Sequence, residues 1–355
     1  MPLSDHFDGE RFFNPGASQA RGLGAVLRWQ LARDKARWPE HIPNPSFPPP
    51  GDAVAPGHVS LTFIGHSTFL IRVPGPHGIT SILTDPIFSE RCFPVQWMGP
   101  RRVRAPGLAI EALPPIDAVL VSHNHYDHMD LPSLRALHRR FRPQVLTTLG
   151  NARPLQEAGM PDAVELDWWG SVTAGPVQVT ATPARHFAAR GVRDRNKTLW
   201  AGFMLEADGR RLLFAGDSGA GPHWTAIRDR LGPPGVALLP IGAYLPRSIM
   251  QAVHMDPAEA VQARADLGAH RAIGMHFGTF QLTDEAVDAP VRTLELARAA
   301  AGLQSQDFEV LGFGETRSFR YDQETCHCEP ASARQSRQPE PRSKRTTLDC
   351  CVALT

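Results

Sequence analysis

Three histidines and an aspartate crowd into six residues of this chain, in the run His-Asn-His-Tyr-Asp-His from His123 to His128. Alternate side chains of an extended segment point to the same side, so His123 and His125 can reach one point together. Asp127 and His128 can then turn toward a second point a few ångströms away. Zinc accepts imidazole and carboxylate ligands, and paired metal ions about 3.5–4 Å apart assist displacement reactions. The run therefore predicts ligands for two metal ions.

Short β-like runs elsewhere in the chain end beside further possible ligands. These runs cover residues 59–64, 81–84, 118–121, 177–182, 211–215 and 272–275. Loops at the ends of rigid strands are common positions for reactive groups. We expect the first metal to be held by His123, His125 and His186. We expect the second to be held by Asp127, His128 and His276, with Asp217 bridging both ions through its two carboxylate oxygens.

This ligand set predicts two zinc ions, with iron or manganese as alternatives, because imidazole and carboxylate donors suit these metals better than soft thiolate chemistry does. A water shared between the two ions would have its pKa lowered toward about 7 and could act as the nucleophile at neutral pH. Asp127 and Asp217 are the carboxylates that we expect to be catalytic.

Helical patterns lie between several of the β-like runs. Leu131, Leu134, Leu137 and Phe141 form an apolar stripe, and a second helix is expected after Asp256, which is followed by proline at the first helical position. The mixture of strands and helices predicts an α/β (α+β) sandwich with the metal ligands on loops at one edge.

Composition limits the classes of function. The chain has 355 residues, and its 37 Lys and Arg residues nearly balance 36 Asp and Glu residues, which argues against broad nucleic-acid binding. Four of the five cysteines lie in the last thirty residues, so we expect no disulfide framework and a reducing, cytoplasmic location. The sequence shows no signal-peptide pattern and no apolar run near the ~18 residues of a membrane span. Contact with the inner surface of a membrane remains an alternative.

Three segments are expected along the chain: residues 1–57 as a helical extension with a proline-rich connector, residues 58–321 as the hydrolase domain, and residues 322–355 as a disordered tail. In the first segment, apolar residues recur at helical spacing near Arg28; they are Leu23, Val26, Leu27 and Leu31. This pattern fits a basic amphipathic helix that contacts lipid. A helix packed against the main domain is the plainer interpretation, and we favour it.

The ligand pattern resembles the metallo-β-lactamase fold superfamily, and flanking motifs resemble the N-acylphosphatidylethanolamine-hydrolysing phospholipase D family. The motifs lie at residues 83–89, 98–101, 113–118, 122–128, 165–169, 240–244 and 276–280, and the similarity covers about residues 56–320. The resemblance implies an αββα sandwich with a di-zinc site. It also implies cleavage of a glycerophospholipid phosphodiester to phosphatidic acid and an N-acylethanolamine.

Other residues are candidates for supporting roles. His66 and Asp85 could orient ligating imidazoles, although a core histidine and a turn carboxylate are equally good interpretations. His254 is expected to contact the substrate phosphate, and Tyr126 and Gln96 to lie near the substrate.

Two other functional classes stay open. The same site could hydrolyse a lactone, a β-lactam or a sugar phosphate, because the fold does not settle the substrate. A di-iron redox protein with the same ligands is the third hypothesis.

Overall fold

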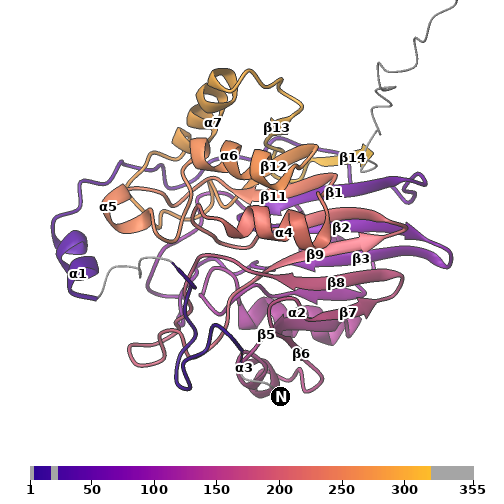
Figure 1. Cartoon of the computed structure of the whole chain (residues 1–355), viewed down its shortest axis with the longest axis horizontal. Coiled ribbons are helices and arrows are strands. Elements are labelled where there is room, and N and C mark those ends of the chain that lie inside the picture. Colours follow the sequence, from indigo (N-terminus) through magenta and orange to yellow (C-terminus); the bar gives the residue numbers. More distant parts are fainter. Residues whose placement is uncertain (1–3, 17–22, 321–355) are drawn as a thin grey trace, which may run out of the picture. The chain divides into compact units, whose positions relative to one another are not determined.

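Two seven-stranded sheets make up the centre of the protein in the computed structural model, which describes residues 4–16 and 23–320 (Figure 1). The first sheet has the order β14-β1-β2-β3-β4-β5-β6, with β1 His58–Gly65, β2 Thr68–Gly75, β3 Gly78–Thr84, β4 Ala118–Leu120, β5 Gln144–Thr148, β6 Val164–Leu166 and β14 Thr316–Arg320. The second has the order β13-β12-β11-β10-β9-β8-β7, with β7 Ser171–Ala174, β8 Val177–Thr182, β9 Gly202–Ala207, β10 Arg210–Phe214, β11 Val236–Pro240, β12 Arg271–Met275 and β13 Phe308–Glu309.

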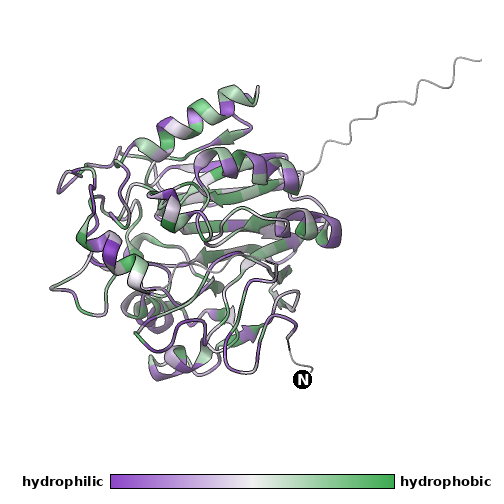
Figure 2. Cartoon of the chain, turned by 60° about the vertical axis from the view of Figure 1, so that its left-hand side comes forward, coloured by the Kyte–Doolittle hydropathy of each residue, from purple (hydrophilic) through white to green (hydrophobic). Residues whose placement is uncertain are grey.

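Helices cover the outer faces of both sheets. Helices α2 (Leu131–Phe141) and α3 (Ala152–Glu157) pack on the first sheet, and α4 (His223–Leu231), α6 (Pro257–Leu267) and α7 (Ala289–Ala300) on the second. The described chain also contains α1 (Leu23–Leu31), α5 (Arg247–Met250) and the 3-10 helix η1 (Ile110–Ala112). The expected αββα sandwich is confirmed. Its strands are mainly apolar and the surrounding loops are richer in polar residues (Figure 2).

The helical patterns of the sequence explain how these layers pack. In α2, Leu134 and Leu137 of the predicted stripe are buried against the first sheet. Helix α6 begins as expected, because the Asp256 carboxylate accepts a hydrogen bond from the backbone amide of Glu259 and the Glu259 carboxylate accepts one from the backbone amide of Asp256. This capping box satisfies amides that the first helical turn leaves without partners.

All six β-like runs of the sequence are strands, and the loops that follow four of them carry the metal-ligand candidates. Strand β4 leads into the histidine run, and β8, β10 and β12 lead to His186, Asp217 and His276. Gly216 has a φ of +59°, and a Cβ atom there would stand 2.8 Å from the carbonyl oxygen of Ala201. Only glycine therefore fits the sharp turn that presents Asp217.

The N-terminal region lies along the sandwich. His6 stacks on Trp168 with ring centroids 3.8 Å apart. In the proline-rich connector, the backbone amide of Ile42 donates a hydrogen bond to the carbonyl of Val103. The predicted disordered tail, residues 322–355, lies outside the described residues. Among the described residues, no helix is long and apolar enough to cross a membrane.

Candidate metal centre

The three side chains expected at the first metal converge at the ends of β4 and β8. The Nε2 atom of His123 lies 2.8 Å from Nδ1 of His125, which lies 3.2 Å from Nε2 of His186. His123 and His186 are almost fully buried, and their ligand atoms fall in one compact group. The backbone carbonyl of Val253 accepts a hydrogen bond from Nδ1 of His186, which leaves Nε2 free to face the other two rings.

The side chains expected at the second metal form an adjoining group. One oxygen of Asp217 lies 3.1 Å from Nε2 of both His128 and His276. One oxygen of Asp127 lies 3.4 Å from each of the same two nitrogens. The Asp217 oxygen is also 3.8 Å from Nε2 of His186, which belongs to the first group. The structure thus brings all seven predicted ligands together, with Asp217 between the two groups.

The polar atoms of this cluster fit a pair of cations. Among the described residues, Nε2 of His128, Nε2 of His276 and Oδ1 of Asp217 are buried without a hydrogen-bond partner. A buried polar atom without a partner costs free energy, whereas a cation would satisfy imidazole and carboxylate lone pairs at once. The cluster is a metal site, and its seven ligands and the identity of the metal stay predictions.

The histidines of the two groups differ in protonation. Burial lowers the pKa of His123, that of His125 to about 4 and that of His186 to about 3, so these rings are neutral and able to ligate. Burial also acts to lower the pKa of His276. The carboxylates of Asp217 and Asp127 outweigh that effect and raise the pKa to about 9. Without metal, a proton therefore takes the position of a cation near Asp217.

The stability of the metal-free protein should peak near pH 6.5. Between about pH 4 and 6.5 the unfolded chain takes up a proton on His125 that the folded chain rejects, so stability rises with pH. From about pH 6.5 to 9 the folded chain keeps a proton on His276 that the unfolded chain has lost, so stability falls.

Urea unfolding in a chelating buffer at stepped pH measures this profile. The metal-loaded protein should lack the fall above pH 6.5, because a ligating His276 carries no proton there. A metal-free protein whose stability keeps rising to pH 9 would contradict the proton assignment.

Asp85 contacts a histidine of the second ligand group directly and one of the first group through Ser122. Its carboxylate is fully buried and lies 2.6 Å from Nδ1 of His128. It also accepts hydrogen bonds from the Oγ and the backbone amide of Ser122, whose Oγ is 2.9 Å from Nδ1 of His123. These contacts fit the prediction that Asp85 orients a ligating imidazole, and they fix which nitrogen of His128 faces the centre.

His66 contacts a carboxylate of the cluster instead of an imidazole nitrogen. Its Nε2 lies 2.9 Å from an oxygen of Asp127, and its backbone carbonyl accepts the amide of His276. His66, Asp85 and His276 all have positive φ, at 58°, 34° and 60°. Such strained backbones gather at functional sites, where the surrounding fold holds them in place.

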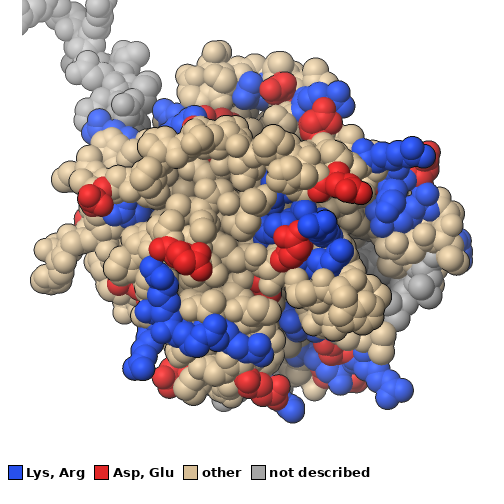
Figure 3. All heavy atoms as spheres, turned by 180° about the vertical axis from the view of Figure 1, so that it is seen from behind, with Lys and Arg blue, Asp and Glu red and all other residues tan. Residues whose placement is uncertain are grey.

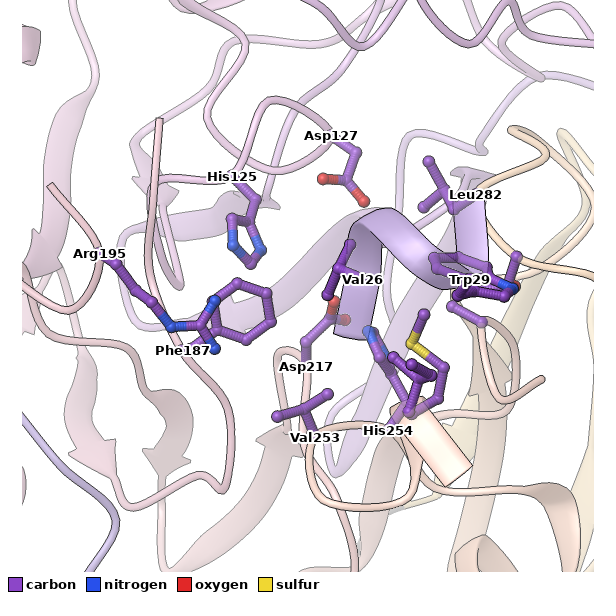
Figure 4. A pocket seen from close by; sticks show the side chains of 14 residues that line it. Val26, Trp29, His125, Asp127, Phe187, Arg195, Asp217, Val253, His254 and Leu282 are labelled. Carbon is purple, nitrogen blue, oxygen red and sulfur yellow. The ribbon is translucent and has the colours of Figure 1, made fainter. Parts of the chain in front are cut away.

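A pocket of about 230 Å³ opens above the cluster. His125, Asp127, Asp217 and His254 face it, and its other walls are mainly apolar, formed by Val26, Trp29, Phe187, Ala243, Ile249, Met250, Val253, Leu282 and Thr283, with Arg195 as the added cation. Figure 4 shows Phe187 and Arg195 on one side and Trp29 and Leu282 on the other. Charged chemistry thus lies at the base of an apolar chamber.

Helix α1 forms part of that chamber wall, as the favoured interpretation of a helix packed on the domain requires. The indole of Trp29 donates to the carboxylate of Asp284, 2.5 Å away, and the guanidinium of Arg33 donates to the same group at 2.8 Å. Leu31 of the predicted stripe is 91% exposed instead of packed. Val26 and Trp29 of this helix therefore line the pocket, and Leu31 at its end is open to solvent.

Not every substrate candidate reaches this pocket. Gln96 is exposed and its amide hydrogen-bonds the backbone of Arg91, so it shapes its own loop and does not line the chamber. The Tyr126 hydroxyl donates to the carbonyl of Arg190, which directs the ring away from the metal cluster. His254 does line the pocket, and its Nδ1 has no partner.

Four residues of the site were not among the candidates from the sequence: Trp29, Phe187 and Arg195, which line the pocket, and Ser122, which contacts Asp85 and His123. Because Phe187 directly follows the predicted ligand His186, its place in the sequence could have indicated that it lies near the metal site. Trp29 is remote from every motif, and only the tertiary fold brings it to the site.

A family model described as the beta-lactamase superfamily domain matches residues 80–277, more than half of the chain. The chain belongs to the β-lactamase superfamily. Together with the metal site, this membership makes it a metal-dependent hydrolase of the metallo-β-lactamase fold.

Proteins from other organisms are similar in sequence to most of this chain. An uncharacterized protein of Mycobacterium tuberculosis is 38% identical over 278 residues, which are 76% of this chain and 72% of that protein. The N-acyl-phosphatidylethanolamine-hydrolyzing phospholipase D 1 of Caenorhabditis elegans is 32% identical over 268 residues, 72% of this chain and 74% of that protein. Among solved structures, a metallo hydrolase from the archaeon Ignicoccus hospitalis covers 75% of this chain and is itself covered fully, with a TM-score of 0.56 and 24% identity. That likeness concerns the fold alone.

Proposed function

We propose that this protein is a di-zinc phosphodiesterase of the phospholipase D type. Its expected substrates are N-acylphosphatidylethanolamine-like glycerophospholipids, and its products phosphatidic acid and an N-acylethanolamine. The observation that carries the proposal is the apolar chamber directly above the metal cluster. A lipid phosphodiester offers the same combination, an anionic phosphate between apolar chains. The name of the C. elegans relative agrees with this substrate class.

The seven predicted ligands would hold the two cations, and bound cations supply Lewis acidity toward phosphoryl oxygens and water. The rest of the chemistry belongs to the chain. Burial lowers the pKa of His254 to about 3, so this ring is a neutral hydrogen-bonding group beside the phosphate position. Arg195, whose guanidinium stands 4.3 Å from the Phe187 ring centroid, adds positive charge at the chamber wall. Phe187, Val253 and Leu282 exclude water and receive an acyl chain.

A substrate panel tests this proposal. The zinc-loaded protein should release phosphatidic acid from vesicles containing N-acylphosphatidylethanolamine and should cleave a bis-aryl phosphate more slowly. A lactone and a cephalosporin serve as the competing substrates. Hydrolysis of the lactone or the cephalosporin, with none of either phosphodiester, would favour the alternative hydrolase function.

We further propose that the rim of the chamber contacts an anionic membrane surface. Four of the exposed large hydrophobic residues lie on α1 or in the loops of residues 85–101 and 187–197: Leu31, Trp97, Met98 and Val192. The two loops meet at Tyr126, because the Phe93 and Tyr126 ring centroids are 6.2 Å apart and the Arg190 guanidinium lies over the same tyrosine ring. Seen from behind, one group of Lys and Arg side chains lies toward the edge of the molecule that carries α1, and a second group lies low on the opposite side (Figure 3). Basic residues around apolar tips suit an anionic bilayer.

Replacing Trp97, which is 77% exposed, by glutamate should weaken binding to anionic vesicles by about tenfold or more, since it removes an aromatic anchor and adds a repelled charge. Vesicle co-sedimentation measures this effect. Leu296→Glu is the matched control, because Leu296 is similarly exposed at 72% but belongs to α7. Equal binding by both variants would contradict the rim as the docking surface.

A further inference from the structure

One arginine connects the two parts of the predicted ligand set. The loop of residues 122–130 carries four predicted ligands, His123, His125, Asp127 and His128, and the loop of residues 187–197 follows His186. Arg190 lies in the second loop, four residues after His186, and reaches across to the first. It makes none of the predicted metal contacts.

The guanidinium of Arg190 spans the ligand loop. Its Nη1 donates to the carbonyl of Asn124 and to the carbonyl of Met129, each at 2.9 Å. These two carbonyls bracket the stretch that carries His125, Asp127 and His128. Between them, the amides of His128 and Met129 both donate to the carbonyl of His125, which gives the stretch one tight turn. Arg190 therefore ties the start of that turn to its end.

Arg190 and Tyr126 contact each other through both their side chains and the Arg190 backbone. The guanidinium carbon lies 4.0 Å from the ring centroid of Tyr126, and the Tyr126 hydroxyl donates to the carbonyl of Arg190 at 3.0 Å. Tyr126 stands between His125 and Asp127, so this stacking fixes the middle of the ligand loop. An arginine suits the position because its planar group can donate and stack at the same time.

Arg190 is itself held in place. The carboxylate of Asp194 accepts the backbone amides of Arg190 and Gly191 at 3.0 and 2.8 Å. The amide of Asn196 donates to the carbonyl of Ala188 at 2.7 Å, which closes the loop. These contacts of the 187–197 loop are made through its backbone and do not involve the Arg190 guanidinium.

We propose that Arg190 is a positioning residue that holds the ligand loop in its metal-binding geometry and couples it to His186. The proposal rests on the ligand assignment given above. Removing Arg190 leaves the seven ligands in the sequence but frees the stretch between Asn124 and Met129, which presents three of them. Partners that orient metal ligands typically contribute about 10–100-fold to metal affinity.

The test compares Arg190→Ala, Arg190→Lys and the control Arg193→Ala in the full chain. Arg193 is exposed in the same loop and carries the same charge. Zinc retention is measured by competition with a chelator, and thermal unfolding is measured with and without zinc. Arg190→Ala should bind zinc with about 10–100-fold lower affinity than the wild type, so a lower concentration of chelator removes its zinc. Arg190→Lys should be intermediate, because one amine keeps the charge but cannot stack and span the loop equally well.

A positioning role also predicts where stability is lost. Arg190→Ala should reduce the rise in melting temperature that zinc produces, since that rise reports affinity for the folded state. An equal loss of stability with and without zinc, at unchanged zinc affinity, would overturn the proposal and leave Arg190 a merely structural residue. Equal zinc loss by Arg193→Ala would also overturn it. If Arg190→Ala does not fold, wild-type zinc retention by Arg190→Lys decides against the proposal. A wild type that binds no zinc would instead refute the ligand assignment itself.

Discussion

Asp217→Asn should leave the protein folded but poor in metal, with turnover lowered by at least about 100-fold, the loss that even a supporting partner of a ligand can cause. Asp217 stands between the two ligand groups, 3.1 Å from both His128 and His276. Burial acts to raise the pKa of its carboxyl, but His128 and His276 hold that pKa well below its usual range, so the group is an anion. Asparagine keeps the shape but removes the charge and one acceptor oxygen.

Metal content per chain, measured by elemental analysis beside turnover, checks this expectation. The matched control is Asp229→Asn, because Asp229 is an exposed carboxylate on α4 that pairs with Arg228 and lies outside the cluster. The control should keep wild-type metal and activity. An Asp217→Asn protein with both metals and full turnover would show that this carboxylate does not bridge.

Asp85→Ala should have the second large effect, on stability and metal affinity together. The change leaves His128 and two donors of Ser122 buried without their acceptor. Breaking such a buried charged network costs about 3–5 kcal/mol of the free energy of unfolding. It also frees the His128 ring to turn, which should weaken metal binding by about 10–100-fold.

Urea unfolding and chelator competition measure the two parts of this prediction. Asp117→Ala is the control, since Asp117 directly precedes β4 of the same sheet, is exposed, and its carboxylate accepts one hydrogen bond, from the backbone amide of Ser81. That change should cost about 1 kcal/mol and leave metal binding unchanged. A stable Asp85→Ala protein with normal metal affinity would reduce Asp85 to the turn carboxylate of the alternative interpretation.

The fold could be predicted in detail from the sequence because its local signals agree with its packing. The six β-like runs are strands, the apolar stripe of residues 131–141 is helix α2, and α6 begins after Asp256 as expected. The two sheets follow less directly, because pairing such as β1 with β14 joins segments more than 250 residues apart. No local pattern fixes such a pairing, although the family resemblance implied the sandwich.

The metal-binding side chains of the candidate site could be predicted from the sequence, because their residue types indicate their chemistry. Imidazoles and carboxylates at strand ends are recognisable in a sequence. The walls of the chamber are not, because Trp29 and Leu282 are ordinary apolar residues until α1 folds over the site. Gln96, which we expected near the substrate, is instead held in its own loop by hydrogen bonds with the backbone of Arg91, and no sequence pattern indicates those bonds.

Reconstitution of the metal-free protein tests the central claim most directly. Zinc is added stepwise to chelator-treated protein, and phosphatidic acid released from N-acylphosphatidylethanolamine vesicles is measured at each step. The account predicts that release is negligible without zinc and rises until two equivalents per chain are bound. Full release of phosphatidic acid by the metal-free protein, or none at two bound zinc ions per chain, would contradict it.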